Sequence, residues 1–161
     1  MRRLICCFFA SILFASCNTN IVKSEYQSLE NGVWNKDTVL QFSLAKMDTV
    51  KKHDIYINVR NDNSFPYSNL FLIASITTPE GQVTKDTLEY DMSLPDGTWL
   101  GKGSGSIKEN KLWYKENIVF SSSGVYTIEV SQAMRKNGNV SGIISLEGIT
   151  DVGIEVTKST P

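Results

Sequence analysis

The side chains that most often carry out catalysis, histidine and cysteine, are scarce in this chain of 161 residues. His53 is the only histidine, so a multi-histidine metal site is excluded, and any histidine catalysis would need partners within hydrogen-bond reach of this one ring. It follows two lysines in a stretch typical of a turn, and we predict an exposed loop residue. The cysteines are at positions 6, 7 and 17. Residues 18–161 therefore contain no thiol nucleophile, disulfide or cysteine metal site.

Three groups of polar residues have atoms suited to chemistry but lack the spacing that the chemistry needs. The glycine-rich stretch Gly101–Ser106 lacks the G-x-x-x-x-G-K-[ST] spacing of a phosphate-binding loop. The acids between Asp86 and Asp96 would suit a glycosidase only if two carboxyl groups faced each other about 5–10 Å apart. Asn61–Asn63 offers oxygen ligands for calcium but no EF-hand loop. We therefore predict no catalytic residue, no metal and no cofactor.

The first seventeen residues, MRRLICCFFASILFASC, have the layout of a secretory signal. Arg2 and Arg3 give a positive start, and the apolar run Leu4–Ala15 is too short for a membrane-spanning helix, which needs about 20 residues. A signal that ends directly before a cysteine resembles the signals of bacterial lipoproteins. That resemblance implies cleavage after residue 16 and lipid on the sulfur of Cys17. The alternative is a plain secretory signal with an incidental cysteine.

The remaining chain has the size of one ordinary domain. Cleavage leaves 145 residues, enough to bury a core, and loss of the two arginines changes the formal net charge from −1 to −3. There is no basic excess, so we predict no nucleic-acid partner. Residues 17–32 are polar after the cysteine, and we interpret them as a lipidated Cys followed by a flexible tether.

Residues 33–161 show apolar side chains at every second position, the period of β-strands. Turn residues such as glycine, proline and asparagine separate the runs at intervals of about 10–15 residues. We predict an all-β fold: a single antiparallel β-sandwich, immunoglobulin-like or jelly-roll-like. The expected strands are 39–44, 55–60, 70–77, 82–90, 106–114, 124–132 and 152–157.

Several phrases, in this order, resemble one family. They are Val59–Asn61, Pro66–Leu72, Pro79–Gly81, Asp86–Tyr90, Gly97–Gly103, Gly124–Tyr126, Gln132–Arg135 and Gly148–Ile154. Together they are similar to the gliding-motility lipoprotein H (GldH) family. The resemblance implies a cell-envelope lipoprotein, anchored to a membrane through its N-terminal lipid and tied to other motility and secretion envelope proteins. It implies no enzymatic activity.

Four residues are candidates for contact with a partner or ligand: Tyr67, Trp99, Trp113 and Arg135. We predict a non-catalytic role through protein–protein contacts, with a carbohydrate- or peptide-binding module as the alternative. In that alternative the three aromatic residues form one platform. Trp99 either plugs one end of the core or is an exposed contact. Arg135 belongs either to a contact surface or to an internal hydrogen-bond network, the latter being our expectation for Arg60.

Two further expectations concern modification and location. Asp48-Thr49-Val50 resembles the Asp-Ser/Thr-apolar acceptor of bacterial O-glycans. Thr49 is the candidate for O-glycosylation, because its stretch of sequence is the one most typical of a loop. The alternative is an ordinary Asp-Thr pair beside a strand. Asn18 is not the aspartate that commonly retains lipoproteins in the inner membrane. We predict the outer membrane, with the domain facing the periplasm.

Overall fold

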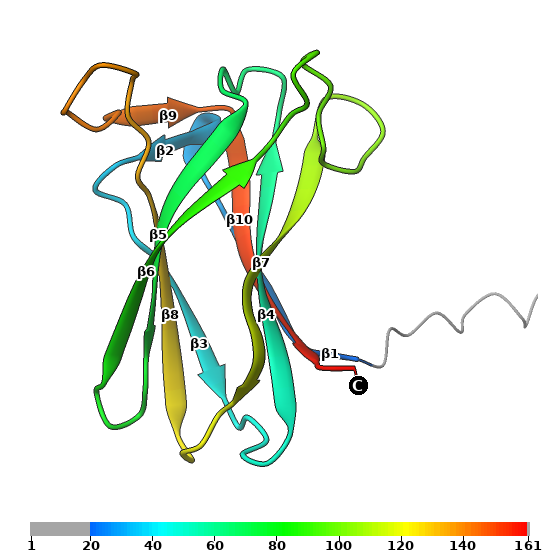
Figure 1. Ribbon diagram of the computed structural model, residues 1–161, viewed down its shortest axis with the longest axis vertical. Helices are drawn as coiled ribbons and strands as arrows, with labels where there is room; N and C mark the ends of the chain where they lie inside the picture. Colours follow the sequence, from blue (N-terminus) through cyan, green and yellow to red (C-terminus); the bar gives the residue numbers. More distant parts are fainter. Residues whose placement is uncertain (1–19, 161) are drawn as a thin grey trace, which may run out of the picture.

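Alternating apolar side chains organise the chain into strands, as the sequence predicts. The computed structural model describes residues 20–160 (Figure 1). All seven predicted strands are present, and the largest difference is that β7 continues beyond its expected end. The elements are β1 (Ile21–Ser28), the 3-10 turn η2 (Glu30–Gly32), β2 (Val33–Asn35), β3 (Leu40–Ala45), β4 (Lys52–Asn61), β5 (Asn69–Thr77), β6 (Val83–Asp91), β7 (Lys108–Val119), β8 (Val125–Gln132), β9 (Ser145–Glu147) and β10 (Ile149–Lys158).

The strands pair as one long hairpin folded over itself. β1 pairs with β10, β3 with β8, β4 with β7 and β5 with β6, all antiparallel. Two further pairings, β10 with β4 and β5 with β8, join these ribbons into the sheets β1-β10-β4-β7 and β3-β8-β5-β6. This nested order is the jelly roll. An immunoglobulin-like order is excluded, because it pairs the first strand with the second within one sheet. The predicted antiparallel sandwich is thus confirmed.

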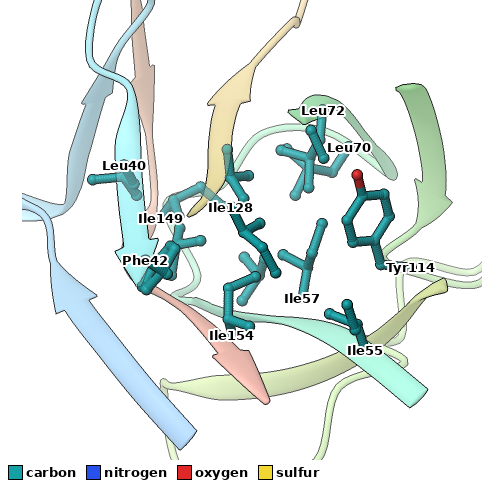
Figure 2. Close-up of a cluster of buried hydrophobic side chains, with 14 of the residues drawn as sticks. Leu40, Phe42, Ile55, Ile57, Leu70, Leu72, Tyr114, Ile128, Ile149 and Ile154 are labelled. Atoms are coloured by element: carbon teal, nitrogen blue, oxygen red, sulfur yellow. The ribbon is translucent and has the colours of Figure 1, made fainter. Parts of the chain in front are cut away.

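The core lies between the two sheets (Figure 2). In β3, Leu40, Phe42 and Leu44 are at most 6 % exposed, whereas Gln41 and Ser43 between them are exposed. Successive side chains of a strand point to opposite faces, so this alternation turns one whole face inward. Each large apolar side chain buried in this way stabilises the fold by about 1.5–3 kcal/mol. The part of the chain that the structure describes contains no cysteine, so this core and the strand ladders hold it together.

The predicted tether over residues 17–32 was wrong for its larger part. Ile21–Ser28 is β1, which pairs with β10 from Ile21 opposite Thr157 to Ser28 opposite Asp151. β1 is an edge strand whose two faces are both partly exposed, so its sequence lacks the one-sided apolar pattern of a core strand. Its ladder hydrogen bonds and the packing of Tyr26 hold it. Cys17 lies outside the described residues.

Candidate functional site

A network of polar and aromatic side chains covers the outer face of the sheet β1-β10-β4-β7. Arg60 of β4 has its Cζ 4.3 Å above the ring centroid of Tyr26 in β1, and its Nε donates to Glu109 of β7 at 3.2 Å. The hydroxyl of Tyr26 donates to the same carboxylate at 2.9 Å. Burial, and then the hydrogen bond to Glu109, raise the pKa of Tyr26 to about 12. The expected network around Arg60 is therefore present, but on an outer face instead of inside the sandwich.

Trp113 belongs to a second cluster on this outer face. Its ring centroid lies 4.4 Å from that of Tyr56, the residue opposite it in β4. The ammonium of Lys111 lies 4.0 Å from the centroid of the Tyr56 ring and pairs with Glu155 at 2.6 Å. The lysine thus covers the face of Tyr56. Trp113, half exposed, remains available for contact.

Tyr67 and Trp99 lie together, away from the Trp113 cluster. Both rings pack against the buried Phe65, with centroid distances of 5.8 Å and 6.2 Å. The indole N–H of Trp99 points to Oδ1 of Asn63 at 3.4 Å, and the side chain is partly buried against the core. Trp99 therefore acts mainly as a plug at the end of the sandwich that carries β2 and β9. A single platform of Tyr67, Trp99 and Trp113, as the carbohydrate-binding alternative needs, is not formed.

Arg135 lies on the rim of an open hollow of about 550 Å³ on the outer face of the second sheet. Its floor contains Phe71 and Ile73 from β5, together with Ala133 just after β8. Arg135 and Lys136 are exposed, and neither forms an ion pair within residues 20–160. The hollow thus combines an apolar floor with a cationic rim. Sequence reasoning selected Arg135 but missed the floor, although the unbroken apolar run of β5 signalled an outward face that is apolar as well.

Three of the four acids clustered in sequence, Asp86, Glu89 and Asp96, have a structural partner. Asp86 pairs with Lys115 at 2.9 Å and accepts a hydrogen bond from the hydroxyl of Tyr114 at 3.2 Å. Glu89 accepts from the amide of Asn69 at 2.8 Å. Asp96 accepts from the backbone N–H two residues later, as turn aspartates do. Over residues 20–160, no group of three His, Cys, Asp or Glu side chains is placed to hold a metal ion.

The prediction that His53 is an exposed loop residue was wrong. The ring is 1 % exposed and packs edge-on against Phe120, with ring centroids 5.3 Å apart. His53 lies on the same face of β4 as the buried Ile55 and Ile57, so its ring points into the sandwich. Among the described residues, its Nδ1 has no hydrogen-bond partner. Burial lowers the pKa of His53, and the nearby carboxylate of Asp48 only partly opposes this effect.

Thr49 is exposed, in the loop that joins β3 to β4. The carboxylate of Asp48 accepts hydrogen bonds from the N–H groups of Val50 and Lys51 at 2.9 and 3.1 Å, which shapes this loop. A glycan on Thr49 would project into solvent. The chain from residue 20 to residue 160 contains no helix with the length and hydropathy to cross a bilayer.

Comparison with known proteins identifies relatives along almost the whole chain. The family model described as GldH lipoprotein matches residues 21–156. A gliding motility lipoprotein GldH homolog of Christiangramia forsetii is 54 % identical over 151 residues, which cover 94 % of this chain and 92 % of the relative. The gliding motility lipoprotein GldH of Flavobacterium johnsoniae is 46 % identical over 149 residues, covering 92 % of each chain.

A solved structure of the infectious bursal disease virus VP2 subviral particle matches with a TM-score of 0.40 and 14 % identity. That match covers 88 % of this chain but only 34 % of the viral chain, so the protein spans about a third of that chain's length. The family match over residues 21–156 and the relatives aligned along nearly their whole lengths show that this chain belongs to the GldH lipoprotein family.

Proposed function

We propose that this protein is a lipid-anchored component of the gliding motility apparatus and its linked secretion machinery, acting through protein–protein contacts and not through catalysis. The observation that carries the proposal is that two relatives named as gliding motility lipoproteins match more than nine-tenths of the chain. The anchor is lipid on Cys17, and the domain faces the periplasm from the outer membrane. Asp86 and Glu89, two of the acids that sequence reasoning considered for hydrolysis, make structural contacts, which supports the non-catalytic role.

The anchor is tested by fractionating cells that carry Cys17→Ser. We expect the variant to leave the membrane fraction, because the lipid on Cys17 is the proposed anchor and residues 20–160 contain no helix long and apolar enough to cross a bilayer. Cys7→Ser is the matched control, because it removes a thiol from the segment that cleavage discards. A Cys17→Ser protein that stays as firmly membrane-bound as the parent would overturn the lipid anchor.

The contact surface that we propose is the hollow beside Arg135 together with the adjoining loop from Lys136 to Ile144. Val140 and Ile144 in this loop are 88 % and 62 % exposed. Exposed apolar side chains next to an apolar floor and a cationic rim suit a partner that brings an apolar side chain and a carboxylate.

This surface is tested by replacing Val140 with a photocrosslinking amino acid in native membranes. Val83, 62 % exposed at the start of β6, is the matched control at the opposite end of the sandwich. We expect a defined set of envelope proteins to be captured from position 140, to be absent from position 83, and to be lost when Arg135→Glu is added. Capture of the same abundant proteins from both positions would contradict the contact surface.

A further inference from the structure

The first described residues show where the anchored end of the domain lies. The N–H of Lys158 donates to the carbonyl of Asn20 at 2.9 Å, and the N–H of Ser159 donates to the carbonyl of Lys52 at 3.0 Å. The start of β1, the end of β10 and the start of β4 therefore form one row. Figure 1 shows the start of β1 beside the C-terminus. Cys17 precedes Ile21 by four residues, so covalent geometry limits their Cα separation to about 14 Å.

This end of the sandwich carries lysines around the anchored strand. Lys52 and Lys158 are exposed, and neither forms an ion pair in the part of the chain that the structure describes. Lys51 is also exposed and makes a surface pair with Asp48 at 3.4 Å, which solvent weakens. Acids also lie at this end: Asp54 accepts a hydrogen bond from Ser159 at 2.6 Å and is nearly buried, and Glu116 of β7 and Glu80 of the β5–β6 turn are exposed. Lys52 and Lys158 are the exposed cations in the row beside the start of β1.

The same end also presents apolar side chains to solvent. Val50 is 83 % exposed at the tip of the β3–β4 loop, and the carboxylate of Asp48 holds that tip by accepting from the backbone N–H groups of Val50 and Lys51. Val119 is 44 % exposed and lies opposite Lys52 in the ladder between β4 and β7. Ile21 and Val22, at the start of β1, are 38 % and 41 % exposed. An apolar tip flanked by lysines matches the interfacial zone of a bilayer with anionic headgroups.

We propose that the end of the sandwich bearing Val50, Lys51, Lys52 and Lys158 rests on the phospholipid headgroups, so that the domain stands end-on from the membrane. This inference rests on the proposed lipid at Cys17, which alone fixes only that the start of β1 is close to the bilayer. The lysines and Val50 select the end-on orientation over one in which the domain lies on its side. The loop with Val140, beyond the opposite end of strands of about ten residues, then points away at a height of roughly 30 Å.

Fluorescence quenching on the full-length lipoprotein tests this orientation. Residues 18–161 contain no cysteine and the proposed lipid blocks Cys17, so Val50→Cys or Val140→Cys gives one thiol for a fluorophore. Each labelled protein is placed in vesicles of phosphatidylethanolamine and phosphatidylglycerol that contain a lipid with a nitroxide-labelled headgroup. We expect strong quenching at position 50 and none at position 140. Adding Lys52→Glu and Lys158→Glu should reduce the quenching at position 50, whereas Lys136→Glu should not.

The outcomes separate the orientation from the anchor. Equal quenching at both positions, or quenching at position 140 alone, in protein that floats with the vesicles would overturn the end-on orientation while leaving the lipid anchor intact. Quenching at position 50 that the two lysine reversals leave unchanged would overturn the role of the lysines. Protein that fails to float with the vesicles would overturn the lipid at Cys17 and the orientation with it.

Discussion

Replacing Gly153 by alanine adds one methyl group, which we expect to loosen the packing of β1 against β10. This residue of β10 lies beneath β1, and a Cβ there would be 2.6 Å from the carbonyl oxygen of Glu25 and 2.7 Å from Cδ1 of Tyr26. Neither atom is the far end of a flexible side chain, so β1 itself must shift. The φ of Gly153 is not in the left-handed region, so alanine can adopt the backbone conformation and the effect of Gly153→Ala is one of packing.

The size of the effect follows from two opposing contributions. Forcing a methyl group into a filled contact costs about 1–3 kcal/mol. Replacing glycine by alanine where the backbone permits it returns about 0.4–1 kcal/mol, because the unfolded chain loses freedom. The net loss of about 1–2 kcal/mol falls on the docking of β1, because both crowded residues belong to that strand. Release of β1 would lengthen the connection from Cys17 from about 14 Å to roughly 40 Å at Leu29.

Hydrogen exchange measured by mass spectrometry on the purified lipoprotein is the assay. We expect the amides of β1 to exchange about 5–30 times faster in Gly153→Ala, in proportion to that free energy. Gly142→Ala is the matched control, because the nearest atom to its added Cβ is the carbonyl oxygen of Met134 at an ordinary 3.6 Å. Adding Tyr26→Ala to Gly153→Ala removes the ring contact but not the contact with Glu25. Equal exchange of β1 in the two glycine variants would refute the reasoning.

Three more predictions concern stability and modification. Burial lowers the pKa of His53, so the unfolded state binds a proton more readily, and the free energy of unfolding falls by at most about 1.4 kcal/mol per pH unit as the pH drops below about 6.5. Urea midpoints measured at pH 7 and pH 5 should show a smaller loss of stability in His53→Phe than in the parent. An equal loss in the two proteins would contradict this prediction. Phe42→Ala, at a fully buried side chain, should lower the unfolding free energy by about 3–5 kcal/mol in urea titrations, whereas Val50→Ala should change it by less than about 0.5 kcal/mol. If Thr49 carries a glycan, Thr49→Ala should lower the intact mass by more than the side-chain difference, and a drop of only that difference would exclude it.

The sequence is informative wherever a strand has one buried face. In β3 and β8 the alternation of apolar and polar side chains is the direct imprint of a sheet packed on one side, so both strands and their inward residues could be predicted. β1 could not, because an edge strand with two partly exposed faces needs no apolar period. Its position depends on a distant glycine, Gly153, over which Tyr26 packs. No local pattern in residues 21–28 records that contact.

His53 and Arg135 also show that the residues next to a side chain in sequence do not decide whether it is buried in the fold. The charged surroundings of His53 in the sequence indicate exposure, but the ring shares the inward face of β4 with Ile55 and Ile57 and packs against Phe120. The sequence around Arg135 indicates either a contact or an internal network, and only the placement of Phe71 and Ile73 beneath it shows a surface hollow. Burial in a jelly roll is decided by which strands become neighbours, and those strands are far apart in sequence.

The nested strand order would allow the proposed membrane contact and the proposed partner contact to be made at the same time. Pairing the first strand with the last puts the start of β1, and hence the anchor, at the same end as the β3–β4 loop. β8 runs away from that end over eight residues, about 26 Å, and delivers Arg135 and the hollow to the other end. Occupation of one end therefore leaves the other accessible. A headgroup contact that failed at Val50 would leave the Arg135 surface intact, so the two sites can be disabled independently.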